Sequence, residues 1–263
     1  MKTSMLAGVL AGLLVPALAM AQSPIDGTWK IDMNQVKLPA KSDVLVLKDD
    51  MFRCGTCAPP YEVKADGADH MVAGHPYFDT VAVTVVDDHT VKETDKKNGR
   101  VVATTTTTVA PDGKTATFEF SDSSDSQGPP VTGEGTLART AKGPAGSHAL
   151  SGSWRTASYR RISDNALSMT FKEEGGSLTM HSPTGQSYTA RLDGTDAPFH
   201  GDPGVTSVSV TRSDARTFVE TDKRDGKPVS VARMSVHPDG KTMDVAIDNR
   251  LRGTHTSFVA VKQ

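Results

Sequence analysis

The chain has few aromatic residues, only two cysteines and no strong excess of either charge. Aromatic side chains make up 5% of the 263 residues, which argues against a carbohydrate or nucleic-acid surface built on ring stacking. The formal net charge is −2 at pH 7, so no overall field attracts the phosphates of a nucleic acid. We therefore expect no nucleic-acid partner.

Sequence motifs of known chemistry are also missing. The sequence contains no G-x-S-x-G, no H-E-x-x-H and no phosphate-binding glycine loop. Asp79, Asp87 and Asp88 are acidic enough to suggest calcium, but they do not have the spacing of an EF-hand. The sequence therefore predicts a protein that is not an enzyme, with no catalytic residue, no bound metal and no cofactor.

The N-terminus carries the one long apolar run. It reads MKTSMLAGVLAGLLVPALAMAQ, in which Lys2 precedes an apolar stretch and Ala19-Met20-Ala21 closes it. This order is typical of a secretory signal peptide, and the stretch is short for a membrane span of about 20 apolar residues. We expect residues 1–21 to be a signal peptide cleaved after Ala21. The mature protein is then periplasmic or secreted, and it does not span a membrane.

The chain contains the same unit twice. A shift of 127 residues places Tyr61–Phe118 on Tyr188–Val245 without a gap, and 23 of these 58 positions are identical. A shift of 125 places Gly27-Thr28-Trp29 on Gly152-Ser153-Trp154. Internal repeats of this kind indicate repeated structural units. We predict one domain at 22–141, a linker at 142–150 and a second domain at 151–263.

Within each unit, apolar residues alternate with polar ones. Val81, Val83 and Val85 share one face of an extended chain, and this period of two predicts half-buried β-strands. Turn signals such as Lys97-Asn98-Gly99 and Arg224-Asp225-Gly226 separate the strands. We predict eight or nine strands per unit, which in the second unit are Gly152–Arg155, Ala166–Lys172, Ser177–His181, Gln186–Leu192, Val205–Arg212, Thr217–Lys223, Val229–Val236, Met243–Asp248 and Thr254–Val261.

These strands predict an all-β fold. Short hairpins favour an up-and-down antiparallel sheet, and a sheet of this size removes its exposed edges by closing into a barrel. Two tandem barrels are therefore expected, and one continuous sheet spanning both units is the alternative.

The Gly-x-Trp start of each unit resembles the signature that opens the lipocalin and wider calycin-type barrels. Glu93-Thr94-Asp95-Lys96 and its repeat, Glu220-Thr221-Asp222-Lys223, lie roughly where lipocalins carry Thr-Asp-Tyr, with Lys in place of Tyr. No match to the closing arginine motif is found. The resemblance implies that Trp29 and Trp154 form barrel floors and that a barrel binds a small apolar molecule. The chain is also similar to secreted bacterial tandem-repeat proteins of unknown function.

Paired carboxylates recur in this motif. Glu93 and Asp95, like Glu220 and Asp222, are two residues apart and share one face of a strand, as acid–base chemistry would require. Their place beside a glycine turn in both units favours surface ion pairs instead.

Cys54 and Cys57 form the one C-x-x-C pair. A redox centre needs a helix N-terminus to lower a thiol pKa, and a structural zinc site needs two further ligands. The pair lies in a turn, and exported proteins fold in an oxidising environment. The second unit makes the same corner with Ser182-Pro183-Thr184-Gly185 and no cysteine. We predict a Cys54–Cys57 disulfide with a structural role.

Three functions remain open. The leading hypothesis is an exported, non-enzymatic binding protein of the bacterial cell envelope that holds a small apolar or lipidic ligand in a barrel, at residues the sequence does not identify. The second is a structural or protein-interaction module, possible partners being envelope proteins. Residues 22–141 carry 12 basic and 18 acidic side chains and residues 142–263 carry 16 and 13. This asymmetry is explained either by drift after duplication or by halves that attract one another or face different partners. The third is a redox or metal-binding role for the C-x-x-C pair.

Overall fold

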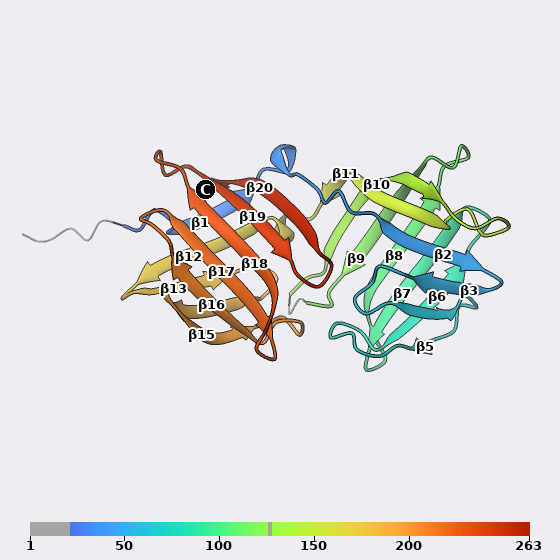
Figure 1. Cartoon of the computed structure of the whole chain (residues 1–263), viewed down its shortest axis with the longest axis horizontal. Coiled ribbons are helices and arrows are strands. Elements are labelled where there is room, and N and C mark those ends of the chain that lie inside the picture. Colours follow the sequence, from blue (N-terminus) through green and yellow to red (C-terminus); the bar gives the residue numbers. More distant parts are fainter. Residues whose placement is uncertain (1–21, 126–127) are drawn as a thin grey trace, which may run out of the picture.

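The computed structural model describes residues 22–125 and 128–263, which form two barrel-like bodies lying side by side (Figure 1). The predicted signal peptide falls outside the described residues. The described part consists of twenty strands and two single-turn 3₁₀ helices, Met33–Gln35 and Asp164–Ala166, so the predicted all-β fold is confirmed. None of these helices has the length and apolar character needed to cross a bilayer.

One sheet closes on itself, and we call it the second barrel because most of its strands come from the second half of the chain. Its strands, in their order around the barrel, are β1 (Gly27–Ile31), β12 (Ser168–Glu174), β13 (Ser177–His181), β14 (Ser187–Arg191), β15 (Asp193–His200), β16 (Ser207–Arg212), β17 (Thr217–Arg224), β18 (Lys227–Val236), β19 (Thr242–Asn249) and β20 (Thr254–Lys262).

The other sheet, which we call the first barrel, also has ten strands. Their order is β4 (Tyr61–Lys64), β3 (Met51–Cys54), β2 (Asp43–Lys48), β11 (Gly152–Ile162), β10 (Val131–Lys142), β9 (Thr115–Asp122), β8 (Arg100–Val109), β7 (Thr90–Lys97), β6 (Thr80–Val85) and β5 (His70–Met71). Its ends come together where Asp66 bridges to Thr84 and the Gly67 amide donates to the Val83 carbonyl at 2.9 Å. The sheet therefore curls into a barrel.

The two barrels exchange their Gly-x-Trp strands. Strand β1 pairs with β12 and β20, so it lies among the strands of the second half, where Figure 1 shows it in blue beside orange and red. Strand β11 pairs with β10 and β2 in the first barrel. The first barrel is thus one continuous segment, 43–162, inserted between β1 and β12 of the second.

The sheets therefore do not follow the predicted boundaries 22–141, 142–150 and 151–263, which follow the repeat. A repeat shows which segments are alike, not which segments pair. One Gly-x-Trp strand lies between β2 and β10, and the other lies between β12 and β20. Because the units are homologous, either position suits the Gly-x-Trp strand of either unit. The alternative of one continuous sheet is wrong, since the hydrogen-bonded strands form two separate sheets.

The two tryptophans are buried at equivalent places. Trp29 and Trp154 are 0% and 1% exposed, and each indole N–H donates to a backbone carbonyl four residues earlier at 2.7 Å. A cation covers each ring: the Arg139 guanidinium lies 4.0 Å from the centre of Trp154, and the Lys262 ammonium 4.9 Å from that of Trp29. Arg139 comes from β10, the strand that pairs with the Trp154 strand β11.

All nine strands predicted in the second unit overlap strands of the structure, but the prediction missed β15. Its sequence, Asp193 to His200, contains Asp, Gly and Pro, which are typical of turns. Its pairing with β16 is interrupted between Asp193 and Asp196, so the strand is irregular as well as polar.

The strand exchange predicts which fragment folds. Residues 38–163 contain all ten strands of the first barrel and Trp154, so we expect them to fold alone. Residues 22–141 lack β11, which leaves β2 and β10 with unpaired edges, so we expect this fragment to stay unfolded or to aggregate. Near-ultraviolet circular dichroism and thermal unfolding measure the difference. Cooperative folding of 22–141 as a monomer would contradict the exchange.

Candidate functional site

The interiors of the two barrels differ. The second barrel is filled by buried side chains, among them Tyr188, Phe218, Met234 and Met243. The first barrel contains a cavity of about 580 Å³. Its apolar wall consists of Leu45, Phe52, Val91, Leu137, Leu150 and Trp154, with Tyr61, His75 and Phe78 as further ring-bearing residues.

Side-chain size at three equivalent inward positions contributes to this difference. At these positions the first barrel has Val91 for Phe218, Thr107 for Met234 and Ala116 for Met243. All six side chains are buried or nearly so, hence each exchange removes volume from the barrel interior. Val91 and Thr107 line the cavity directly.

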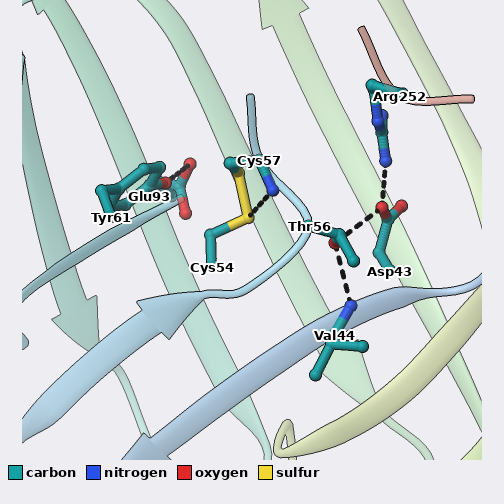
Figure 2. The surroundings of a disulfide bond; sticks show 8 residues. All are labelled: Asp43, Val44, Cys54, Thr56, Cys57, Tyr61, Glu93 and Arg252. Atoms are coloured by element: carbon teal, nitrogen blue, oxygen red, sulfur yellow. Dashed lines mark hydrogen bonds and ion pairs between the residues drawn. A yellow bond between two sulfur atoms is a disulfide. The ribbon is translucent and has the colours of Figure 1, made fainter. Parts of the chain in front are cut away.

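A carboxylate lies on the cavity wall. Glu93 lines the cavity, and its Oε1 accepts a hydrogen bond from the Tyr61 hydroxyl at 3.0 Å (Figure 2). The expectation that Glu93 forms a surface ion pair is therefore wrong. Val91 on the same strand is buried in the barrel, and Glu93 and Asp95 follow it on the same face. That alternation was the signal that could have placed both carboxyls inside.

The lysine of the motif does form a surface ion pair. Lys96 lies on the opposite face of β7, and its ammonium is 2.7 Å from a carboxylate oxygen of Asp69. In the second barrel Lys223 pairs with Asp196 in the same way. The ion pairs expected at this motif thus involve its lysines, while its acids point inward.

Asp95 has no hydrogen-bond partner for its carboxylate among residues 22–125 and 128–263, and its Oδ1 is buried. Its equivalent in the second barrel, Asp222, also has a buried unpaired Oδ1, but its Oδ2 accepts from Ser230 at 2.5 Å. The residue equivalent to Ser230 is Ala103, which pairs with Asp95 across the strands. The first barrel has therefore lost a donor that the second retains.

Both barrels hold carboxyls that resist ionisation. Burial raises the pKa of Glu93, and burial together with the charges of Glu93 and Asp122 raises the pKa of Asp95 to about 8. Burial and the neighbouring Asp222 raise the pKa of Glu220 to about 8. Each pair thus keeps protons at a pH where exposed carboxyls are ionised.

A neutral histidine faces Glu93 across the aromatic group. The His75 ring stacks on Phe78, with 4.5 Å between ring centres, and meets the edge of Tyr61 at 5.6 Å. Burial lowers the pKa of His75, so the imidazole is uncharged at neutral pH. Its Nε2 is buried and unpaired within the described structure.

The disulfide forms another part of the wall. Cys54 and Cys57 are bonded, both line the cavity, and Cys54 is 5% exposed. The loop that they close carries Thr56, whose hydroxyl accepts from the Val44 amide at 3.0 Å and donates to Asp43 at 3.1 Å (Figure 2). Within the described residues, no group of three or more His, Cys, Asp or Glu side chains is arranged to hold a metal ion.

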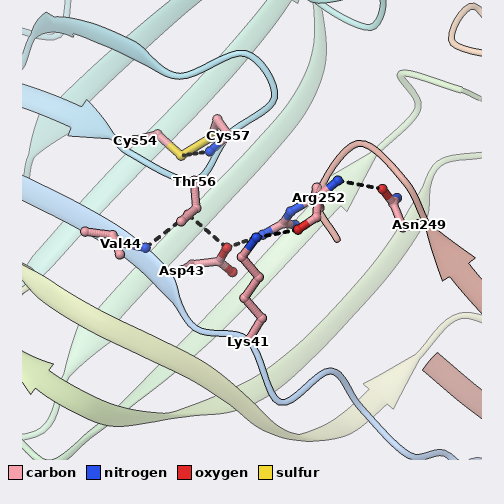
Figure 3. A network of polar contacts seen from close by, with 8 residues as sticks. All are labelled: Lys41, Asp43, Val44, Cys54, Thr56, Cys57, Asn249 and Arg252. Atoms are coloured by element: carbon pink, nitrogen blue, oxygen red, sulfur yellow. Dashed lines mark hydrogen bonds and ion pairs between the residues drawn. A yellow bond between two sulfur atoms is a disulfide. The ribbon is translucent and has the colours of Figure 1, made fainter. Parts of the chain in front are cut away.

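The rim of the cavity is completed by the second barrel. Asn249, Leu251 and Arg252, from the β19–β20 turn, line the cavity on this side. Arg252 forms an ion pair with Asp43, and Lys41 donates to the Arg252 carbonyl (Figure 3). Asp43 and Arg252 are 42% and 44% exposed, so the cavity meets solvent here. The disulfide loop thus orders one side of the rim through Thr56 and Asp43.

No protein-family model matches the chain, and no curated protein matches it either. A barrel architecture hosts many unrelated functions, so the fold alone does not assign one. The chemistry of the cavity carries the functional argument.

The buried carboxyls predict that stability falls as pH rises. A carboxyl with a raised native pKa keeps a proton that the unfolded chain releases, so its contribution is complete below about pH 4 and is lost through about pH 8. Each such proton changes the free energy of unfolding by about 1.4 kcal/mol per pH unit. We expect urea unfolding to show lower stability at pH 8 than at pH 6, with Glu220→Gln flattening the decline.

His75 acts in the opposite direction below about pH 6.5, because its native pKa is lowered, so it offsets part of the decline between pH 6 and pH 7. A stability that rises between pH 6 and pH 8, equally in the parent and in Glu220→Gln, would contradict the ionisation states assigned here.

The disulfide predicts a limited stabilisation. It spans a sequence separation of 3, and the loop-closure entropy of so short a loop is worth about 2 kcal/mol. We expect Cys54→Ser/Cys57→Ser to fold and to lose about this free energy of unfolding in urea. Complete failure to fold would show that the bond does more than close its own loop.

Proposed function

We propose that this is a non-enzymatic binding protein that holds a small apolar or lipidic molecule inside the first barrel. The observation that carries this proposal is a cavity in one of two homologous barrels, the other being filled by its own side chains. Ligand pockets for small molecules commonly measure about 300–1,000 Å³, and the cavity falls within this range at about 580 Å³.

The wall of the cavity suits a hydrocarbon body. Leucine, valine and aromatic side chains make up most of the lining, and each Å² of apolar ligand surface removed from water contributes about 25 cal/mol. The few polar groups stand at defined places: Glu93 and the threonines on the wall, and Asp43 and Arg252 at the rim. Such a distribution binds an apolar body and orients one polar end.

An envelope location is part of the proposal. It rests on the signal-peptide pattern of residues 1–21 and on a disulfide, a bond that persists in oxidising compartments. Kinship with lipocalin-like barrels is also part of the proposal, supported by the Gly-x-Trp strands and the cation over each tryptophan.

Filling the cavity tests this function. Val91→Phe/Thr107→Met introduces the residues of the second barrel at the same positions, so the first barrel should remain folded. We expect the affinity for a neutral apolar dye such as Nile red, measured by fluorescence titration, to fall at least tenfold, since the dye competes with the new side chains.

The matched control is Thr106→Phe, on the same strand but facing outward, opposite Lys92 and Glu119. It should bind the dye as the parent does. Dye binding that survives cavity filling would show that the dye, and any ligand it mimics, binds elsewhere and would overturn the proposal.

A further inference from the structure

We propose that the ligand is a lipophilic amine, whose ammonium group pairs with Glu93 inside the first barrel while its hydrocarbon body occupies the apolar part of the cavity. This inference rests on the proposed function, because it specifies the chemistry of the polar end of the same ligand. Four features of the cavity support it: an acid with no lysine or arginine beside it in the described structure, incompletely paired carboxylates, the contrast with the second barrel and an aromatic wall.

Among the described residues, the inner wall of the cavity carries an acid with no lysine or arginine beside it. Glu93, Thr105 and Thr107 line the cavity, and the Tyr61 hydroxyl proton is already donated to Glu93. Arg252 is the one lysine or arginine among the lining residues of the described structure, and it lies at the rim, paired with Asp43. The interior therefore lacks a cation of its own.

The carboxylates of the first barrel are incompletely paired. Tyr61 is the one hydrogen-bond partner of the Glu93 carboxylate among the described residues, and it binds Oε1. The Asp95 carboxylate, two residues further on the same face, has none there. An ammonium ion offers three N–H donors and no acceptor, which is the complement of such a pair. Removing a carboxylate from water without a partner costs free energy. A bound ammonium supplies that partner and reduces the cost.

The second barrel shows how the same acids are paired more completely without a ligand. Glu220 accepts from Tyr188, Asp222 accepts from Ser230, and bulky residues fill the space beside them. In the first barrel Ala103 stands in place of Ser230 and the space is open. Both barrels contain these acids. In the first barrel, the open volume beside Glu93 occurs together with the missing internal donor.

The aromatic wall also favours a cation. Phe52, Tyr61, Phe78 and Trp154 line the cavity, and the faces of aromatic rings attract ammonium groups. His75 is neutral because burial lowers its pKa, and hence does not repel a cation. A carboxylate ligand would instead place a second acid beside Glu93, and a neutral alcohol would gain no ion pair with it.

Protonation of the site gives the proposal a pH signature. The groups that line or flank the ammonium position are Tyr61, His75, Tyr77, Glu93 and Asp95, with Asp122 acting on Asp95 and with Asp43 and Arg252 at the rim. The pKa of Glu93 and of Asp95 is raised, so an arriving ammonium displaces a carboxyl proton into the buffer. Affinity should therefore increase from pH 5 to pH 8 and decrease again near the pKa of the amine, about 10.4 if it resembles lysine.

Isothermal titration of the chain without residues 1–21 tests this, with n-octylamine, 1-octanol and octanoate as ligands of equal chain length. We expect n-octylamine to bind at least tenfold more tightly than 1-octanol, and octanoate to bind most weakly. Glu93→Gln should weaken octylamine at least tenfold and leave 1-octanol unchanged. The matched control, Glu220→Gln, alters the equivalent acid in the filled barrel and should leave octylamine binding as it is.

Each outcome is decisive. If 1-octanol binds as tightly as octylamine, the amine assignment is wrong while the proposed function stands. If none of the three ligands binds, both fail. Equal losses in Glu93→Gln and Glu220→Gln would place the amine outside the first barrel and overturn the site. Should Glu93→Gln not fold, titration of the parent in buffers of different ionisation enthalpy decides instead, and octylamine binding without proton release contradicts the proposal.

Discussion

Exchange of the two Gly-x-Trp strands is the constraint on which the rest of the structure depends. Strand β11 pairs with both β10 and β2, so the first barrel closes only after the chain has entered its second half. Trp154, which lines the cavity, is delivered by that strand. Because β1 in turn belongs to the second barrel, the two barrels are connected by two chain crossings, and this double connection holds the β19–β20 turn beside the rim.

Duplication explains how a cavity arises without a new fold. The two barrels share their strand order, a buried tryptophan and inward carboxyls, so the second barrel serves as a comparison with a filled interior. Smaller side chains at Val91, Thr107 and Ala116 leave more space in the first. Such replacements weaken packing by about 2–5 kcal/mol each for the larger truncations. The filled barrel and the connecting strands allow the molecule to tolerate that loss.

Sequence reasoning reached the strands because alternation and hairpin turns are local signals, as around Val81 and Asn98-Gly99. It could not predict the strand exchange, since the two homologous Gly-x-Trp strands suit the same position in either barrel. It misassigned Glu93 and Asp95 because their place beside a glycine turn in both units was given more weight than the alternation that continues from buried Val91. The rim contact of Arg252 joins residues 209 positions apart, and no local pattern indicates such a pair.

Buried carboxyls usually weaken a fold, and here two copies of the fold retain them at the same positions. In the filled barrel the cost is reduced by Tyr188, Ser230 and a shared proton, so the acid pair is an inherited part of the scaffold. In the hollow barrel Glu93 of the same pair lines an open volume. In the empty cavity the acid is neutral, so its burial costs little free energy. When a cation binds, the acid ionises and attracts the cation. The raised pKa therefore connects the stability of the empty barrel to the selectivity of the occupied one.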